Sequence, residues 1–281
     1  MNIGGHQVAV CSWSLQPRDM GELVAKLKQI GLSTVQLGLL ELVQLDDKRK
    51  HQELGQLRAA GIDFTGGMIS FPGEDYSTIA QIRRTGGFVP DEQWPLRRRL
   101  AEEAARLARE LGMKTVTAHV GFVPPHDDGR YVPIRDRIRE LAEKFGSFGI
   151  DLLMETGQES AEELLAFLND LSAPNVGINF DPANMILYGA GDPMAAVATL
   201  GRHIRHVHAK DAIPSSKPGQ EWGKEVPFGT GNVKPAEFLK ALHKVGYVGP
   251  LAIEREAGND RVGDVRFAVD SLRQAQHQSD R

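Results

Sequence analysis

Short apolar runs alternate along the chain with longer segments in which hydrophobic residues recur every three or four positions. The short runs are typical of strands buried on both faces, and the longer segments are typical of amphipathic helices. We predict eight strands, at Gln7–Trp13, Thr34–Leu37, Asp63–Ile69, Thr115–Val120, Ile150–Glu155, Val176–Phe180, Ile204–Ala209 and Leu251–Glu254. The predicted helices are Met20–Ile30, Lys48–Ala60, Leu96–Leu111, Ile134–Phe145, Ala161–Leu171, Pro193–Leu200, Pro235–Val245 and Gly263–Gln274.

The same connection between a helix and the next strand recurs along the chain. Five glycines occupy it, namely Gly31, Gly61, Gly112, Gly149 and Gly246. A glycine at this place ends a helix in the left-handed conformation. Repeated strand–helix units predict a parallel sheet, and eight of them in 281 residues fit a closed (β/α)₈ TIM barrel better than an open doubly wound sheet. No linker-like composition interrupts the chain, so we expect residues 1–281 to form one domain.

Four residues that can bind a metal ion stand at or just past the ends of the last four predicted strands: Glu155, Asp181, His208 and Glu254. In such a barrel the carboxyl ends of the strands surround one mouth, so these side chains are expected to converge. A buried carboxylate without a cation is costly. Two glutamates, one aspartate and one imidazole suit a divalent ion such as Mn²⁺, Co²⁺, Mg²⁺ or Zn²⁺. Any one of them alone could instead be an unrelated surface or salt-bridging residue.

The composition excludes several classes of protein. Lys and Arg total 33 against 37 Asp and Glu, a formal net charge of −4 without a basic run, which disfavours a nucleic-acid partner. The one cysteine, Cys11, cannot form an intramolecular disulfide and suits a reducing compartment. The first residues do not have the pattern of a signal peptide, and no apolar stretch approaches the roughly 20 residues of a membrane span. We therefore expect a cytoplasmic protein with no membrane partner.

Several segments together resemble one known family. They are residues 155–159 (ETGQE), 179–184 (NFDPAN), 206–211 (HVHAKD), 229–233 (GTGNV) and 246–256 (GYVGPLAIERE). These motifs are similar to those of the xylose isomerase-like superfamily, and more closely to its sugar phosphate isomerase/epimerase branch. The resemblance covers the whole chain and is densest between residues 155 and 256. It is specific for the superfamily and weak for the substrate.

The resemblance implies that Glu155, Asp181, His208 and Glu254 hold one divalent metal ion, and that Glu155 and Glu254 are also the catalytic acid/base pair. The expected activity is the metal-dependent isomerisation or epimerisation of a sugar or keto-polyol. A metal-bound enediolate would form when one glutamate removes a carbon-bound proton, and the other glutamate would return a proton. The expected partner is this small-molecule substrate, and a homo-oligomer is left open.

Three aromatic or imidazole side chains are candidates for substrate binding. His119 ends the fourth predicted strand and would face the mouth. His206 shares one side of its strand with His208, where it could orient a ligand or substrate or could be a core histidine. Trp13 ends the first predicted strand and could form an apolar wall for a sugar ring or pack in the core.

Four polar side chains extend this set. Gln36 and Gln158 could donate hydrogen bonds to substrate hydroxyls at the mouth. Asn184 departs from the ketose 3-epimerase pattern, which has a substrate-contacting histidine three residues after the aspartate. A clear match to the substrate arginine of those enzymes is also missing, although Lys210 or Lys217 could take that role. These departures weaken an assignment as a simple free-ketose epimerase.

Three other functions compete with the epimerase hypothesis. A dehydratase or lyase, like the inosose dehydratases, would share the enediolate and expel a β-hydroxyl. An apurinic endonuclease-like phosphodiesterase would require further histidine ligands and a basic surface, and Asn184 stands where that branch has a ligand. A sugar-binding barrel without turnover is disfavoured by the intact pair of glutamates, Glu155 and Glu254.

Overall fold

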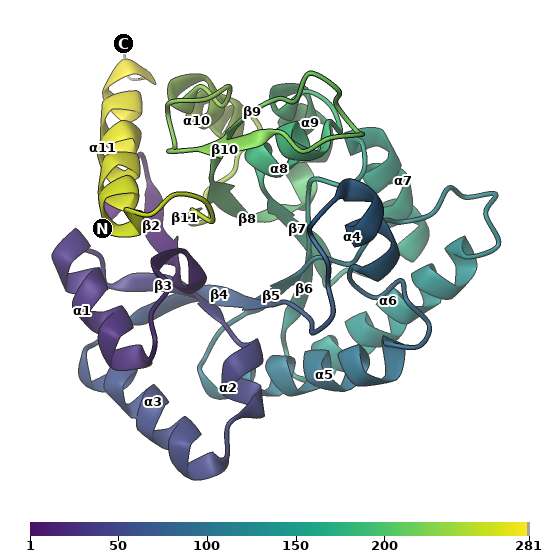
Figure 1. Ribbon diagram of the computed structural model, residues 1–281, viewed down its shortest axis with the longest axis horizontal. Helices are drawn as coiled ribbons and strands as arrows, with labels where there is room; N and C mark the ends of the chain where they lie inside the picture. The colour runs from purple at the N-terminus through teal and green to yellow at the C-terminus, as the bar shows by residue number, and fades with distance from the viewer. Residues whose placement is uncertain (280–281) are drawn as a thin grey trace.

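All eight predicted strands are present in the computed structural model, which describes residues 1–279, and they pair in parallel around a closed ring (Figure 1). They are β2 (His6–Cys11), β3 (Thr34–Gly38), β4 (Asp63–Ile69), β5 (Thr115–Ala118), β6 (Asp151–Glu155), β7 (Val176–Phe180), β8 (Ile204–Ala209) and β11 (Leu251–Ile253). Strand β11 pairs with both β8 and β2, which closes the ring. The prediction of a (β/α)₈ barrel is confirmed.

Helices surround this barrel on the outside (Figure 1). They are α1 (Met20–Ile30), α2 (Leu40–Gln44), α3 (Asp47–Ala59), α4 (Ile79–Thr85), α5 (Trp94–Glu110), α6 (Tyr131–Ser147), α7 (Ala161–Leu171), α8 (Pro182–Tyr188), α9 (Pro193–Leu200), α10 (Pro235–Lys244) and α11 (Arg261–Ser279). Two 3₁₀ turns, Ser12–Leu15 and Gly201–His203, complete the helical elements. Each predicted helix is present, whereas α2, α4 and α8 were not predicted. Among the described residues, no helix is both long and apolar enough to cross a membrane.

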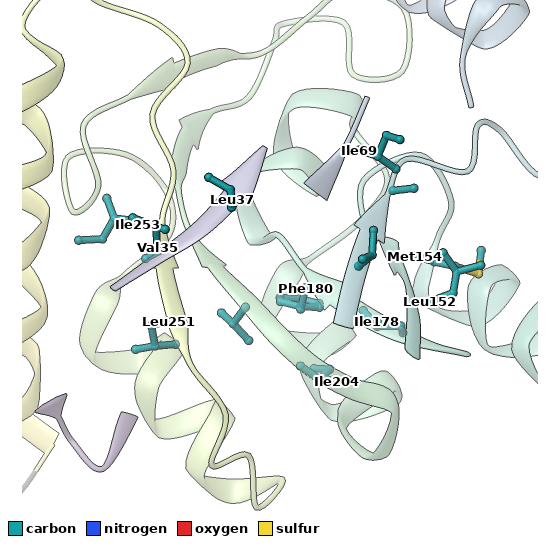
Figure 2. Close-up of a cluster of buried hydrophobic side chains, with 14 of the residues drawn as sticks. Val35, Leu37, Ile69, Leu152, Met154, Ile178, Phe180, Ile204, Leu251 and Ile253 are labelled. Atoms are coloured by element: carbon teal, nitrogen blue, oxygen red, sulfur yellow. The ribbon is translucent and has the colours of Figure 1, made fainter. Parts of the chain in front are cut away.

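The apolar core lies between the barrel and its helices. Alternate residues of each strand point outward, and Figure 2 shows such side chains from several strands, including Val35, Leu37, Ile178 and Phe180. At about 25 cal/mol per Å² of buried apolar surface, this layer is the main source of stability. Several inward-facing positions are small instead, as with Ala9 on β2 and Ala252 on β11. The barrel interior can therefore carry chemistry.

The glycines at the helix-to-strand connections adopt the predicted conformation. Their φ angles are +80° at Gly31, +64° at Gly61, +74° at Gly112, +70° at Gly149 and +74° at Gly246. A side chain would be strained there because left-handed backbone brings Cβ too close to the carbonyl oxygen. These tight turns lie at the amino ends of the strands, away from the mouth.

Two long connections between the barrel strands contain short elements. Residues 70–94 include α4, which begins where the Thr78 hydroxyl accepts a hydrogen bond from the Gln81 amide. Residues 211–233 include an antiparallel hairpin of β9 (Asp211–Ile213) and β10 (Lys224–Val226). A further short strand, β1 (Asn2–Ile3), pairs with β2 at the opposite end of the barrel. The mouth is thus bordered by loops with structure of their own.

Candidate metal centre

The four predicted ligands meet at the carboxyl ends of neighbouring strands. Glu155 is the last residue of β6, Asp181 follows β7, His208 lies near the end of β8, and Glu254 follows β11. One ligand atom from each lies within 4.8 Å of those of the others. All four residues are buried, with exposed fractions of 5% or less.

The facing atoms of this cluster lack hydrogen-bond partners. His208 Nδ1 lies 2.9 Å from Glu155 Oε1, 3.2 Å from Glu254 Oε2 and 3.5 Å from Asp181 Oδ2. Nevertheless Nδ1, Asp181 Oδ2 and Glu254 Oε2 are buried without a hydrogen bond. Buried polar atoms are almost always paired, so a convergent set of unpaired nitrogen and oxygen atoms fits a metal ion at its centre. The residues present therefore suit the divalent ion that the sequence predicts.

The local charge also favours a cation. Three buried carboxylates face the single buried ammonium of Lys210, whose Nζ lies 2.8 Å from Glu254 Oε2. Burial raises the pKa of Asp181 to about 6 although Lys210 opposes this shift. Burial disfavours a charge on the His208 ring, but the nearby carboxylates raise the pKa of His208 well above its usual value. A divalent ion at Nδ1 would take the place of the extra proton on His208, and its two charges would then balance three carboxylates and one ammonium.

Backbone geometry fixes Asp181 before any ligand binds. Asp181 is the N-cap of α8, and its Oδ1 accepts hydrogen bonds from the amides of Ala183 and Asn184 at 2.8 and 2.9 Å. Its own amide donates to the Thr156 hydroxyl, which follows Glu155 on the neighbouring strand. Only Oδ2 is left to face the centre of the cluster.

Two residues that were predicted to bind substrate, Trp13 and Asn184, donate hydrogen bonds to the two glutamates. The indole of Trp13 donates from Nε1 to Glu254 Oε1 at 2.8 Å, so this side chain has a polar contact that the sequence did not predict. Trp13 lies in the 3₁₀ turn Ser12–Leu15, because β2 ends at Cys11, two residues before the predicted end of this strand. Asn184 donates from Nδ2 to Glu155 Oε1 at 3.3 Å and accepts from Lys210 Nζ at 3.2 Å.

The remaining candidates lie at different depths. His119 follows β5, and its Nε2 is 3.3 Å from Glu155 Oε2, beside the cluster. Gln158 lies above it and donates to the Tyr188 hydroxyl at 3.5 Å. His206 is inside the barrel, where its ring nitrogens contact Asn179 Oδ1 and Thr65 Oγ1. This position supports the core alternative for His206, because both nitrogens are already satisfied by protein groups.

Gln36 was predicted to lie at the mouth, but in the structure it lies in the barrel interior. Its Oε1 lies 2.6 Å from His208 Nε2, on the side of the ring opposite the carboxylates. The prediction of a mouth position failed because the alternation of side chains along a strand shows which face of the sheet a residue occupies. It does not show how far below the mouth the residue lies. The only signal in the sequence is a polar residue between Val35 and Leu37 in an otherwise apolar strand.

Aromatic side chains from separate loops cover one side of the mouth. Tyr188 from α8 contacts the rings of Phe122 and Trp222. Trp222 also donates from Nε1 to the carbonyl of Tyr76, which connects the loop after β8 to the loop after β4. Such cover excludes water and favours binding of a small molecule with apolar faces.

The architecture and the ligand set agree with one protein family. A model of the xylose isomerase-like TIM barrel matches residues 24–275. The chain belongs to this family. A crystal structure of a xylose isomerase domain protein from Planctomyces limnophilus has 35% sequence identity to it, with a TM-score of 0.85 and 92% of each chain covered.

Other members of the xylose isomerase-like family extend the comparison. The L-ribulose-5-phosphate 3-epimerase UlaE of Escherichia coli (strain K12 / DH10B) is 27% identical over 180 residues, which are 61% of each chain. The chain thus matches about three fifths of the length of that relative. A xylose isomerase-like TIM barrel protein from Mycobacterium smegmatis, solved in complex with magnesium, shares the fold with a TM-score of 0.75 at 16% identity, with 98% of this chain and 100% of that chain covered.

Proposed function

We propose that the protein is a divalent-metal-dependent epimerase or isomerase of a sugar or keto-polyol. The observation that carries this proposal is the convergence of buried ligand atoms from Glu155, Asp181, His208 and Glu254 at the barrel mouth, where His208 Nδ1 and Asp181 Oδ2 have no hydrogen bond. The epimerase names among the relatives support the same reaction class. Mn²⁺, Co²⁺, Mg²⁺ and Zn²⁺ all suit this ligand set.

The proposed ion is held by these four residues, and it would polarise a substrate carbonyl and the adjacent hydroxyl, which acidifies the neighbouring C–H bond. Glu155 and Glu254 belong to strands β6 and β11, which are separated by β7 and β8 around the ring. A substrate bound between these strands therefore has one carboxylate on each side. This is the arrangement that proton removal from one face and proton return to the other requires.

The surroundings of Glu254 keep its carboxylate ionised and oriented. Burial alone would raise the pKa of Glu254, but Lys210 and His208 hold it well below its usual value. The Trp13 indole fixes one carboxylate oxygen and leaves the other facing the cluster. Glu254 is therefore ionised and oriented before substrate binds. The amide of Asn184 orients Glu155 in the same way from the opposite side.

Solvent isotope exchange tests this proposal directly. With Mn²⁺ or Co²⁺ and a panel of ketoses and keto-polyols in deuterated water, the wild type should incorporate deuterium at the carbon next to the carbonyl. Glu254→Gln should lower the exchange rate by roughly 10²–10⁴-fold, because the amide cannot accept the proton. Mass spectrometry and NMR of the recovered substrate measure both outcomes.

Glu162→Gln is the matched control, since Glu162 is an exposed residue in the first turn of α7. It should exchange at the wild-type rate. Exchange by Glu254→Gln at the wild-type rate would refute the two-carboxylate mechanism. Absence of exchange by the wild type across the panel would refute the proposed epimerase or isomerase. Loss of water with a new enone or diketone would identify the dehydratase alternative instead.

A further inference from the structure

Gln36 lies inside the barrel beside the metal cluster, and the proposed mechanism gives it no role. Its neighbours on β3, Val35 and Leu37, point outward, so its own side chain points inward and is fully buried. A buried carboxamide is costly unless its donors and acceptors are paired. Gln36 donates from Nε2 to the Thr117 hydroxyl at 3.2 Å, and its Oε1 accepts from the Cys11 thiol at 3.4 Å.

The same oxygen of Gln36 determines the tautomer of His208. Gln36 Oε1 lies 2.6 Å from His208 Nε2, and an amide oxygen can only accept. The short contact therefore requires the hydrogen on Nε2. A neutral imidazole with its hydrogen on Nε2 has a free lone pair on Nδ1. Nδ1 is the atom that faces Glu155, Asp181 and Glu254.

The polar groups further inside the barrel are consistent with this tautomer. Asn179 Nδ2 lies 3.2 Å from His208 Nε2, and Asn179 Oδ1 lies 2.6 Å from His206 Nδ1. The amide oxygen accepts from His206 Nδ1, so His206 Nε2 accepts from the Thr65 hydroxyl at 3.0 Å. Because Asn179 turns its nitrogen toward His208, the closer oxygen of Gln36 is the group that can accept the Nε2 hydrogen of His208.

We propose that Gln36 is a positioning residue of the metal centre. It accepts the Nε2 hydrogen of His208 and so keeps the Nδ1 lone pair directed at the ion. This inference rests on the proposed function, because it takes the cluster as a metal site. Loss of such an outer partner of a metal ligand typically lowers metal affinity by about 10- to 100-fold.

Metal titration of the purified protein tests the role of Gln36 without any substrate. Gln36→Met keeps the length of the side chain and removes the acceptor, so we expect Mn²⁺ and Co²⁺ to bind about 10- to 100-fold more weakly by calorimetry. Gln36→Glu keeps an acceptor oxygen near Nε2 and should restore binding to within about threefold of the wild type. The visible absorption of bound Co²⁺, which reports its ligands, should change in Gln36→Met and be recovered in Gln36→Glu.

Two further variants make the result decisive. Thr65→Ser disturbs the barrel interior but keeps the hydroxyl that contacts His206, so it should bind metal as the wild type does. Gln36→Asn shortens the amide beyond reach of Nε2, so its metal binding should be weakened as in Gln36→Met. It provides the comparison with Gln36→Glu if Gln36→Met does not fold. Equal affinity in all Gln36 variants, or an equal loss in Thr65→Ser, would overturn the positioning role. A wild-type protein that binds neither ion would overturn the proposed metal centre itself.

Discussion

Glu159 is a buried carboxyl group close to the mouth that is not part of the ligand cluster. Burial raises its pKa from 4.5 to about 7, although its Oε1 accepts a hydrogen bond from the Val123 amide at 2.8 Å. The folded protein thus binds this proton more tightly than the unfolded chain does. The contribution of Glu159 to stability is therefore most favourable below about pH 4.5 and is lost as the pH rises to about 7.

We predict that Glu159→Gln stabilises the protein at pH values above 7. The amide keeps the acceptor for Val123 and cannot ionise, so the gain approaches about 3 kcal/mol as an upper value, at 1.36 kcal/mol per pKa unit. The difference from the wild type should shrink on acidification and vanish near pH 4. Urea unfolding of both proteins at several pH values measures it. A pH-independent difference would show that Glu159 is not the titrating group.

Residue types at strand ends were sufficient to predict that the four candidate metal ligands meet in one cluster. Each acid interrupts an apolar run, as Glu155 does after Leu152-Leu153-Met154, and such an interruption has few explanations in a buried strand. The partners of these ligands were less accessible to prediction. The contact of Trp13 with Glu254 joins residues 241 positions apart, and no local pattern encodes a contact between the first and last strands.

Among the elements, the β9–β10 hairpin depends on one side chain. The carboxylate of Asp211 is fully buried and accepts four backbone hydrogen bonds, from Ala212 and Val233 at Oδ1 and from Gly229 and Gly231 at Oδ2. It therefore holds together the two ends of the loop that includes Trp222. Gly231 has no room for a side chain, since a Cβ there would lie 2.4 Å from Asp211 Oδ1.

We predict that Asp211→Asn loosens this loop. The new amide group faces two backbone N–H donors, so both lose their acceptor, which costs on the order of 3 kcal/mol. Limited proteolysis should cut residues 214–224 faster, and the amides of Gly229 and Gly231 should exchange hydrogen faster. Asp260→Asn, at an exposed turn on another loop, is the control. Unchanged protection in Asp211→Asn would show that the loop is held by its other contacts.

Strands with clear boundaries and the longer helices were predictable, whereas the shortest helices were not. The predicted strand Val176–Phe180 matches β7 because an apolar run bounded by turn residues has clear ends. Helices α4 and α8 have seven residues each, too few for a hydrophobic period to stand out. Their formation depends on contacts remote in sequence, such as the packing of Tyr188 against Trp222.

At the scale of the whole molecule, the proposed metal centre would be coupled to the stability of the fold. The candidate ligands at the ends of β6, β7, β8 and β11 come together only in the closed barrel, so an ion at this site would bind the folded chain and not the unfolded one. At a free concentration 100 times its Kd, such an ion adds about 2.7 kcal/mol to the free energy of unfolding.

We therefore predict that Tm rises with Mn²⁺ or Co²⁺ concentration and falls with a chelator. Asp181→Asn should abolish this dependence, because its oxygen can still cap α8 while the ligand oxygen and its charge are gone. Differential scanning calorimetry over a range of metal concentrations measures the effect. The same metal-dependent rise in wild type and Asp181→Asn would place the ion elsewhere.

The five glycines in the left-handed conformation mark a difference between the two rims of the barrel in the length of their connections. At one rim, each of these helices passes into the next strand through a short turn with a positive φ angle. At the other rim, the connections range up to the stretch of residues 211–233, which carries a hairpin. In evolutionary terms the barrel is modular: a loop at the mouth can be lengthened or exchanged without moving the register of any strand. A lineage of such proteins can change its substrate through substitutions and insertions in the loops at the mouth, while the turns at the opposite rim continue to specify the fold.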